Sequence, residues 1–351
     1  MVGANSAVRS GGRENAIKLM EVCGTHTMVI ARYGIKKLLP SEIKMTSGPG
    51  CPVCVTDWED VDRVIELAQE EVYVATFGDL MKVPGSKSSL ALEKAKGRKI
   101  KVVYSPIEAV ELAMLHPEKQ VVFIGIGFET TAPTVALSIM TAKARGLKNF
   151  SVLSLHKTMP SAIKHLIEQG SRIHGFLLPG HVCAVVGSKP FDFIADEFGI
   201  PCVVSGFEAS DIIQSISMLI KNRKNPSVEI QYKRAVKPQG NVTAQKIMSR
   251  VFEPCDAKWR GLGIIKNSGL RIRKEWEDFD ASLKWPVTER NRVSDSQTGL
   301  QRYCKCEEIL KGNLEPNGCP LFGRNCTPEK PVGPCMVSSE GACAAYFKYG
   351  G

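Results

Sequence analysis

Short runs of apolar residues recur along the first 220 residues of the chain, and polar or glycine-containing segments separate them. These runs predict seven β-strands, at residues 18–22, 72–77, 100–104, 121–125, 150–155, 175–178 and 202–205. Helix signals lie between them, because Thr56 with Glu59 and Ser105 with Glu108 have the spacing of capping boxes. Strands that alternate with helices are typical of parallel sheets covered by helices. The pattern therefore predicts an α/β fold.

The same pattern divides most of the chain into a tail and two domains. Residues 1–15 lack an apolar run and predict a loose N-terminal tail. Residues 16–118 and 119–220 each alternate strands with helices, which predicts two parallel-sheet α/β domains. The similar segments 127–131 and 206–210 each follow a predicted strand. A pseudo-duplication of one α/β half therefore stays open, beside the simpler interpretation that strand-to-helix loops favour Gly and Pro.

The amino-acid composition changes after residue 220, and we place a third domain at residues 221–351. The stretch 221–260 holds ten Lys or Arg and three Asp or Glu, while residues 285–335 are rich in Pro, Gly, Asn and Cys. A segment of the latter composition buries little apolar surface, so we expect a bound metal centre to stabilise it. The sequence thus predicts a small cysteine-rich domain at the end of the chain.

Composition narrows the classes of function. The 351 residues carry a net charge of +10, and 43% of them are hydrophobic, which is typical of a globular protein and excludes a disordered chain. No apolar run approaches the roughly 18 residues of a membrane span, and the first residues lack the apolar core of a secretory signal. We therefore expect a cytoplasmic protein. Structural disulfides are rare in the cytosol, so the twelve cysteines indicate metal binding, redox chemistry or buried thiols.

Four cysteines near the C-terminus give the strongest chemical signal. They are Cys319, Cys326, Cys335 and Cys343, all within 25 residues of one another. None belongs to the C-x2–4-C knuckle of a zinc site. Thiolates hold iron–sulfur clusters at varied spacings, so we predict a [4Fe–4S] cluster rather than zinc. For Cys304 and Cys306, just upstream, three interpretations stay open: a redox disulfide, an alternative ligand pair, or no role.

A C-x-x-C motif, Cys51 with Cys54, lies directly before the helix start predicted at Thr56. A helix N-terminus stabilises negative charge, so we expect a lowered thiol pKa and a dithiol–disulfide pair. The alternative is one half of a zinc site, which needs a second cysteine pair nearby.

Cys23 and His26 lie in a turn where a predicted strand ends and a helix begins, so we expect the helix start to stabilise a Cys23 thiolate. A thiolate with an imidazole suits a transition metal such as iron, although a single Cys near a His is more often structural than a metal ligand. Glu129 and His181 follow two other predicted strands. Ligands of parallel α/β sheets bind outside the carboxyl ends of the strands. We therefore expect Cys23, Glu129 and His181 to converge with the C-x-x-C pair on one cleft.

Five longer segments occur in a fixed order along the chain. They are Cys-Gly-Thr-His at 23–26, Gly-Pro-Gly-Cys-Pro-Val-Cys at 48–54, Gly-Phe-Glu-Thr-Thr-Ala-Pro at 127–133, Leu-Pro-Gly-His at 178–181 and Cys-Met-Val-Ser-Ser-Glu-Gly-Ala-Cys at 335–343. Together they resemble the HypD family of [NiFe]-hydrogenase maturation factors, which help to build the Fe(CN)2CO group. The resemblance runs from about residue 16 to the end. It implies two α/β domains and a cluster-bearing domain.

The resemblance also implies roles for the site residues. Cys23 matches the cysteine thought to bind the iron that receives cyanide and carbon monoxide, and His26 lies beside it. Cys51 and Cys54 match a pair thought to relay electrons, and the four C-terminal cysteines match the ligands of a [4Fe–4S] cluster. The implied partners are a small HypC-type chaperone, which shares the iron, and a HypE-type protein, which delivers cyanide. Whether the chain turns over without them stays open.

Two other functions compete with this one. A cluster-dependent thiol–disulfide oxidoreductase would use the cluster and the C-x-x-C pair, but would not need Cys23 or His26. The net charge suggests a nucleic-acid-binding protein, yet the basic stretch 221–260 has few interleaved aromatic residues and favours a docking face for an acidic protein. A radical enzyme is excluded, because the spacing C-x3-C-x2-C does not occur.

Overall fold

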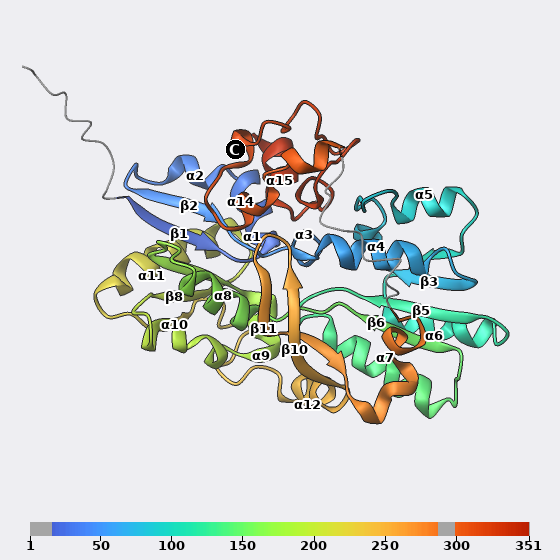
Figure 1. Ribbon diagram of the computed structural model, residues 1–351. Helices are drawn as coiled ribbons and strands as arrows, with labels where there is room; N and C mark the ends of the chain where they lie inside the picture. The colour runs from blue at the N-terminus through green and yellow to red at the C-terminus, as the bar shows by residue number, and fades with distance from the viewer. Residues whose placement is uncertain (1–15, 287–298, 351) are drawn as a thin grey trace, which may run out of the picture.

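The computed structural model describes residues 16–286 and 299–350, so the tail predicted at 1–15 lies outside the described residues (Figure 1). The described chain forms two parallel sheets flanked by helices, an antiparallel hairpin and a C-terminal group of short helices. The predicted α/β fold class is therefore confirmed. Within the described ranges, no helix is both long enough and apolar enough to cross a membrane.

The first sheet has five parallel strands in the order β2-β1-β7-β8-β9. They are β1 (Ile17–Glu21), β2 (Ile43–Ser47), β7 (Gly175–Pro179), β8 (Cys202–Ser205) and β9 (Val228–Ile230). β7 and β8 are buried along their whole length, as parallel strands covered on both faces are. The helices α1 (Gly24–Arg32) and α11 (Ala209–Lys221) share one apolar cluster with the strand residues Leu19, Leu177 and Val203.

The second sheet has four parallel strands in the order β4-β3-β5-β6. They are β3 (Val72–Thr76), β4 (Ile100–Val102), β5 (Gln120–Gly125) and β6 (Phe150–Ser154). The helices α6 (Pro106–Leu115) and α7 (Ala132–Ala144) pack with Phe123 and Val152 in a second apolar cluster. Ser105 and Glu108 form the predicted capping box at α6. At α4 (Trp58–Leu67) the prediction was wrong by one residue, because Asp57 is the cap and accepts the Glu59 N–H.

The two sheets interleave along the chain. β1 and β2 precede the four-stranded sheet in sequence, and β7 to β9 follow it. The predicted division between residues 118 and 119 falls inside the four-stranded sheet, between β4 and β5, and so differs from the division between the sheets. Local alternation predicts strands, but their pairing depends on contacts far apart in sequence. In each sheet the first strand lies between the second and third, the doubly wound order, and the duplication stays a prediction.

The chain after residue 220 contributes to three places. Its first part adds β9 to the five-stranded sheet. The strands β10 (Phe252–Trp259) and β11 (Gly263–Ile272), which the sequence did not predict, form an antiparallel hairpin that packs on α8 (Met159–Glu168). Residues 299–350 form α14 (Cys306–Leu310), α15 (Ala342–Tyr349) and short 3-10 turns, and α15 packs against α1 (Figure 1). The other helices are α2 (Ile35–Leu38), α3 (Pro52–Val55), α5 (Leu90–Ala95), α9 (Gly180–Val186), α10 (Phe193–Asp196), α12 (Val242–Val251) and α13 (Ala281–Lys284).

Candidate functional site

The C-x-x-C motif forms a disulfide in the structure. Cys51 caps α3, and its sulfur accepts the N–H of Cys54 at 3.2 Å. The Cα atoms of the two cysteines are 5.2 Å apart, and both residues are buried. Proline at position 52 suits the first turn of α3, because that turn needs no donor there. The motif therefore brings the two sulfurs together as a redox pair requires.

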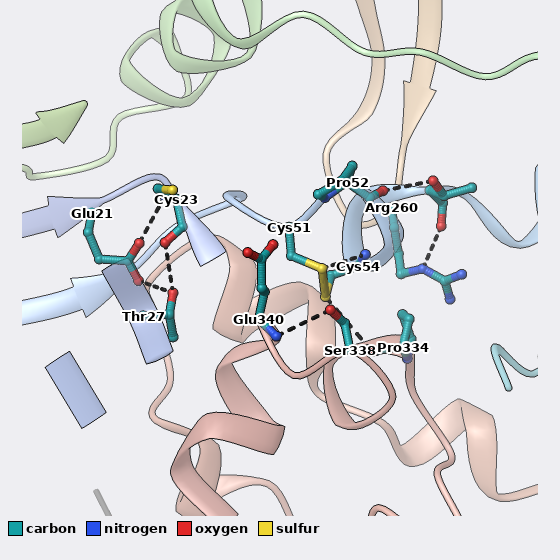
Figure 2. The surroundings of a disulfide bond; sticks show 11 residues. Glu21, Cys23, Thr27, Cys51, Pro52, Cys54, Arg260, Pro334, Ser338 and Glu340 are labelled. Atoms are coloured by element: carbon teal, nitrogen blue, oxygen red, sulfur yellow. Dashed lines mark hydrogen bonds between the residues drawn. A yellow bond between two sulfur atoms is a disulfide. The ribbon is translucent and has the colours of Figure 1, made fainter. Parts of the chain in front are cut away.

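The disulfide lies against the C-terminal cysteine segment (Figure 2). The Cys54 sulfur is 3.8 Å from the carbonyl oxygen of Pro334, the first residue of a 3-10 turn, Pro334–Met336, that contains Cys335. Residues 280 positions apart in sequence thus lie in contact. The disulfide and the cysteine-rich segment form one site.

Six cysteines line one small cavity in this segment. They are Cys304, Cys306, Cys319, Cys326, Cys335 and Cys343, joined by Phe322 and Met336. The pKa of Cys343 is raised well above its ordinary value because the thiol is buried, and thiols around it add to the effect. Within residues 16–286 and 299–350, no three or more Cys, His, Asp or Glu side chains are grouped to hold a single metal ion.

Cys23 lies in the predicted turn after β1 and caps α1, which begins at Gly24 and therefore includes His26. Its N–H donates to Glu21 Oε2 at 2.9 Å, and the Thr27 hydroxyl donates to Glu21 Oε1. Burial raises the pKa of Glu21 to about 7. Burial also raises the pKa of Cys23 to about 12, and the charges of Glu21 and Glu340 raise it further. The backbone N–H groups of α1 lower the pKa of Cys23, as expected for a helix start, but burial outweighs them.

The Cys23 turn and the Cys51 loop touch each other. The N–H of Gly24 donates to the Gly50 carbonyl at 3.0 Å. A Cβ atom at position 50 would overlap the backbone of Cys23, so the contact requires glycine there. Figure 2 shows Glu340 beside the disulfide on the side toward Cys23, and its Oε1 accepts the Thr25 hydroxyl at 2.7 Å. No pattern in the sequence singles out Glu340, although it lies between two predicted cluster ligands.

The rings of His26 and His181 both stack on the ring of Phe207. The ring centroid of Phe207 is 5.0 Å from that of His26 and 3.9 Å from that of His181. The Nε2 atom of His26 is 2.9 Å from the Gly206 carbonyl, which only accepts, so Nε2 carries the proton. Its buried Nδ1 has no hydrogen-bond partner in the described chain, and burial lowers the pKa of His26 to about 4. His26 therefore presents a neutral Nδ1 lone pair.

Glu129 follows β5 and is buried in the second sheet. Its Oε1 accepts the Met159 N–H at 2.9 Å, whereas its Oε2 has no partner among the described residues. Burial raises the pKa of Glu129 to about 7. Burial also raises the pKa of Cys183, and charge on Glu129, Cys202 or Cys23 raises it further, so each of these groups lies within electrostatic range of Cys183. The structure thus brings strand ends of both sheets together, with Cys183 as a buried thiol that the sequence analysis did not select.

The chain is similar to hydrogenase maturation proteins over its whole length. Residues 4–350 match the family described as "HypD: Hydrogenase formation hypA family". It is 46% identical over 346 residues to hydrogenase maturation factor HypD of Rhodobacter capsulatus, covering 96% of this chain and 90% of that protein. It is 42% identical over 343 residues to hydrogenase maturation factor HypD of Escherichia coli, covering 96% of this chain and 90% of that protein. The HypD protein of Cupriavidus necator is 45% identical over 354 residues, covering 97% of this chain and 91% of that protein. The chain therefore belongs to the HypD family of hydrogenase maturation factors.

Proposed function

We propose that this protein is a scaffold on which iron receives cyanide and carbon monoxide to become the Fe(CN)2CO group of [NiFe]-hydrogenase. The observation that carries the proposal is the succession of three contacts: Cys23 beside the Gly50 loop, Cys51 bonded to Cys54, and Cys54 against Pro334. These contacts place a candidate iron ligand, a redox pair and a cysteine-lined cavity next to one another. Such an order suits electron supply to an iron under assembly.

Cys23 is the residue proposed to hold the iron, which is the cargo of this protein. Its thiol has a pKa of about 12, so it is protonated at neutral pH and loses its proton when the metal binds. A soft thiolate suits ferrous iron with strong-field ligands. The unpartnered Nδ1 of the buried His26 supplies a lone pair on the same helix start. Burial of this turn keeps water away from the iron.

Cys51 and Cys54 are proposed to store electrons. Their disulfide takes up two electrons and two protons to give two thiols, and returns them on reoxidation. Cys319, Cys326, Cys335 and Cys343 would hold a [4Fe–4S] cluster, because their soft sulfurs line one cavity. Such a cluster supplies single electrons when bound. The 3.8 Å contact between Cys54 and Pro334 supports exchange between cavity and disulfide.

The proposal includes two protein partners and a cellular location. A HypC-type chaperone would share the iron, and a HypE-type protein would deliver cyanide. The names of the relatives, which are hydrogenase maturation factors, support partners from that machinery. We place the protein in the cytoplasm, where thiols stay reducible.

Infrared spectroscopy with iron analysis separates this function from the thiol–disulfide oxidoreductase. Protein purified without oxygen, together with its small partner, should carry iron beyond four atoms per chain and show bands of metal-bound cyanide and carbon monoxide. A protein with four iron atoms, a cycling disulfide and no such bands is instead the oxidoreductase.

A further inference from the structure

Arg260 is a buried cation that lies near Cys54 and Pro334 (Figure 2). It lies at the end of β10, where the hairpin turns, and only 1% of its surface is exposed. Its Nε donates to the Thr56 carbonyl at 2.8 Å, and its backbone N–H donates to the Val55 carbonyl at 2.8 Å. Neither Nη1 nor Nη2 has a hydrogen-bond partner in the described part of the chain. Four N–H donors of one buried guanidinium therefore lack acceptors.

This arrangement is unfavourable unless an anion completes it. A buried charge without a partner costs several kcal/mol of stability. Stacking on Trp58, at 3.8 Å from the guanidinium carbon to the ring centroid, offsets part of that cost. Asp57 is one acidic candidate, because its charge acts on Arg260, but its Oδ1 accepts the Glu59 N–H and pairs with Lys258 at 3.3 Å. A further negative group is needed near Nη1 and Nη2.

The cysteine-lined cavity can supply this negative group. The residue after Arg260, Gly261, packs against Glu307, because a Cβ atom there would meet the Glu307 Cβ at 2.5 Å. Glu307 belongs to α14, next to Cys306 of the cavity lining. Burial lowers the pKa of Arg260, and negative charge on Cys306, Asp57, Cys335 and Cys304 raises it. The guanidinium therefore lies within electrostatic reach of three cavity sulfurs.

We propose that Arg260 donates hydrogen bonds from its Nη atoms to sulfur at this cavity and supplies the positive charge that balances an anionic [4Fe–4S] cluster there. This inference rests on the proposed function. Hydrogen bonds and net charge around the sulfurs set the reduction potential of such clusters. Reduction adds negative charge, which a fixed cation stabilises, so Arg260 raises the potential. Thr56 and Trp58 hold the guanidinium in place.

A redox titration followed by electron paramagnetic resonance tests the proposal. The full chain is purified without oxygen as wild type, Arg260→Met and Arg260→Lys. Arg271→Met is the matched control, since Arg271 lies on the same hairpin with 65% of its side chain exposed. One charge-assisted hydrogen bond is worth about tenfold in equilibrium. In Arg260→Met the ratio of reduced to oxidised cluster at a fixed potential should therefore fall about tenfold, or about 59 mV for one electron.

The variants distinguish the possible failures. The control should keep the wild-type potential, and Arg260→Lys, which keeps the charge without the planar fork, should lie between wild type and Arg260→Met. A wild type without a four-iron signal refutes the proposed function itself. A loaded Arg260→Met with the wild-type potential refutes only the role of Arg260. If Arg260→Met takes up no cluster, Arg260→Lys decides: a loaded lysine variant supports the need for charge, and an empty but folded one contradicts it.

Discussion

Replacing Glu129 by glutamine should change how the stability of the protein depends on pH. Glu129 is 2% exposed, its Oε1 accepts the Met159 N–H, and its Oε2 has no partner in the described residues. Burial raises its pKa from 4.5 to about 7. The glutamine oxygen keeps the bond to Met159, while its NH2 group replaces Oε2. The variant therefore loses the titration and little of the packing.

The sign of this pH dependence follows from the number of protons that Glu129 binds in the folded and in the unfolded protein. Between pH 4.5 and about 7 the folded protein keeps the Glu129 proton that the unfolded chain has lost. The free energy of unfolding therefore falls as the pH rises through this range and is level above it. At about 1.4 kcal/mol per tenfold change in the equilibrium constant, the whole loss is about 3 kcal/mol, of which about 2.5 kcal/mol falls between pH 5 and pH 8. Glu129→Gln lacks this loss.

Urea unfolding at pH 5 and at pH 8 measures the effect. The variant should gain about 2.5 kcal/mol on the wild type between these two pH values, whatever constant penalty its unpartnered NH2 group adds. Other titrating groups, such as the buried Glu21, cancel in the difference. Glu111→Gln serves as control, because Glu111 is exposed on α6 and should give a curve parallel to the wild type. Parallel curves for Glu129→Gln would refute the reasoning.

Three further predictions concern the site. Cys326→Ala should lose the cluster and destabilise residues 299–350, since metal binding there also stabilises the fold; an unchanged four-iron Mössbauer signal would contradict this. Cys51 and Cys54 should resist alkylation after oxidation and both react after reduction, as mass spectrometry would show; two thiols held by zinc in both states would exclude the relay. His26→Ala should weaken the cyanide and carbon monoxide infrared bands while the cluster remains, and bands of full intensity would exclude its Nδ1 as a contributor.

The sequence predicted local structure better than long-range pairing. The runs 121–125 and 202–205 became β5 and β8 because they are continuously apolar. β2 was missed because Lys44 and Thr46 interrupt its apolar residues. β10 was missed because Asp256 and Lys258 interrupt its apolar residues in the same way. The interleaving of the two sheets depends on pairings between distant segments, which no local pattern encodes.

In the candidate site, too, residues with a local sequence signal were predicted, and residues that depend on distant contacts were not. Residue type and spacing were enough to select Cys51 and Cys54, whose partner is three residues away. Glu340 and Arg260 were not selected, because their importance comes from contacts with α1 and with the turn after α3. The helix start after Cys23 could be predicted from the sequence, and its N–H groups lower the pKa of Cys23, but the burial that raises this pKa to about 12 could not be predicted.

The central claim is that Cys23 holds the iron under assembly, and the infrared spectrum of Cys23→Ser tests it most directly. Serine replaces a soft sulfur by a hard, protonated oxygen, while Cys319, Cys326, Cys335 and Cys343 are unchanged. The variant, purified without oxygen together with its small partner, should keep the four-iron signal and lose the bands of metal-bound cyanide and carbon monoxide. If the bands persist at wild-type intensity, the iron is held elsewhere, and the claim is wrong.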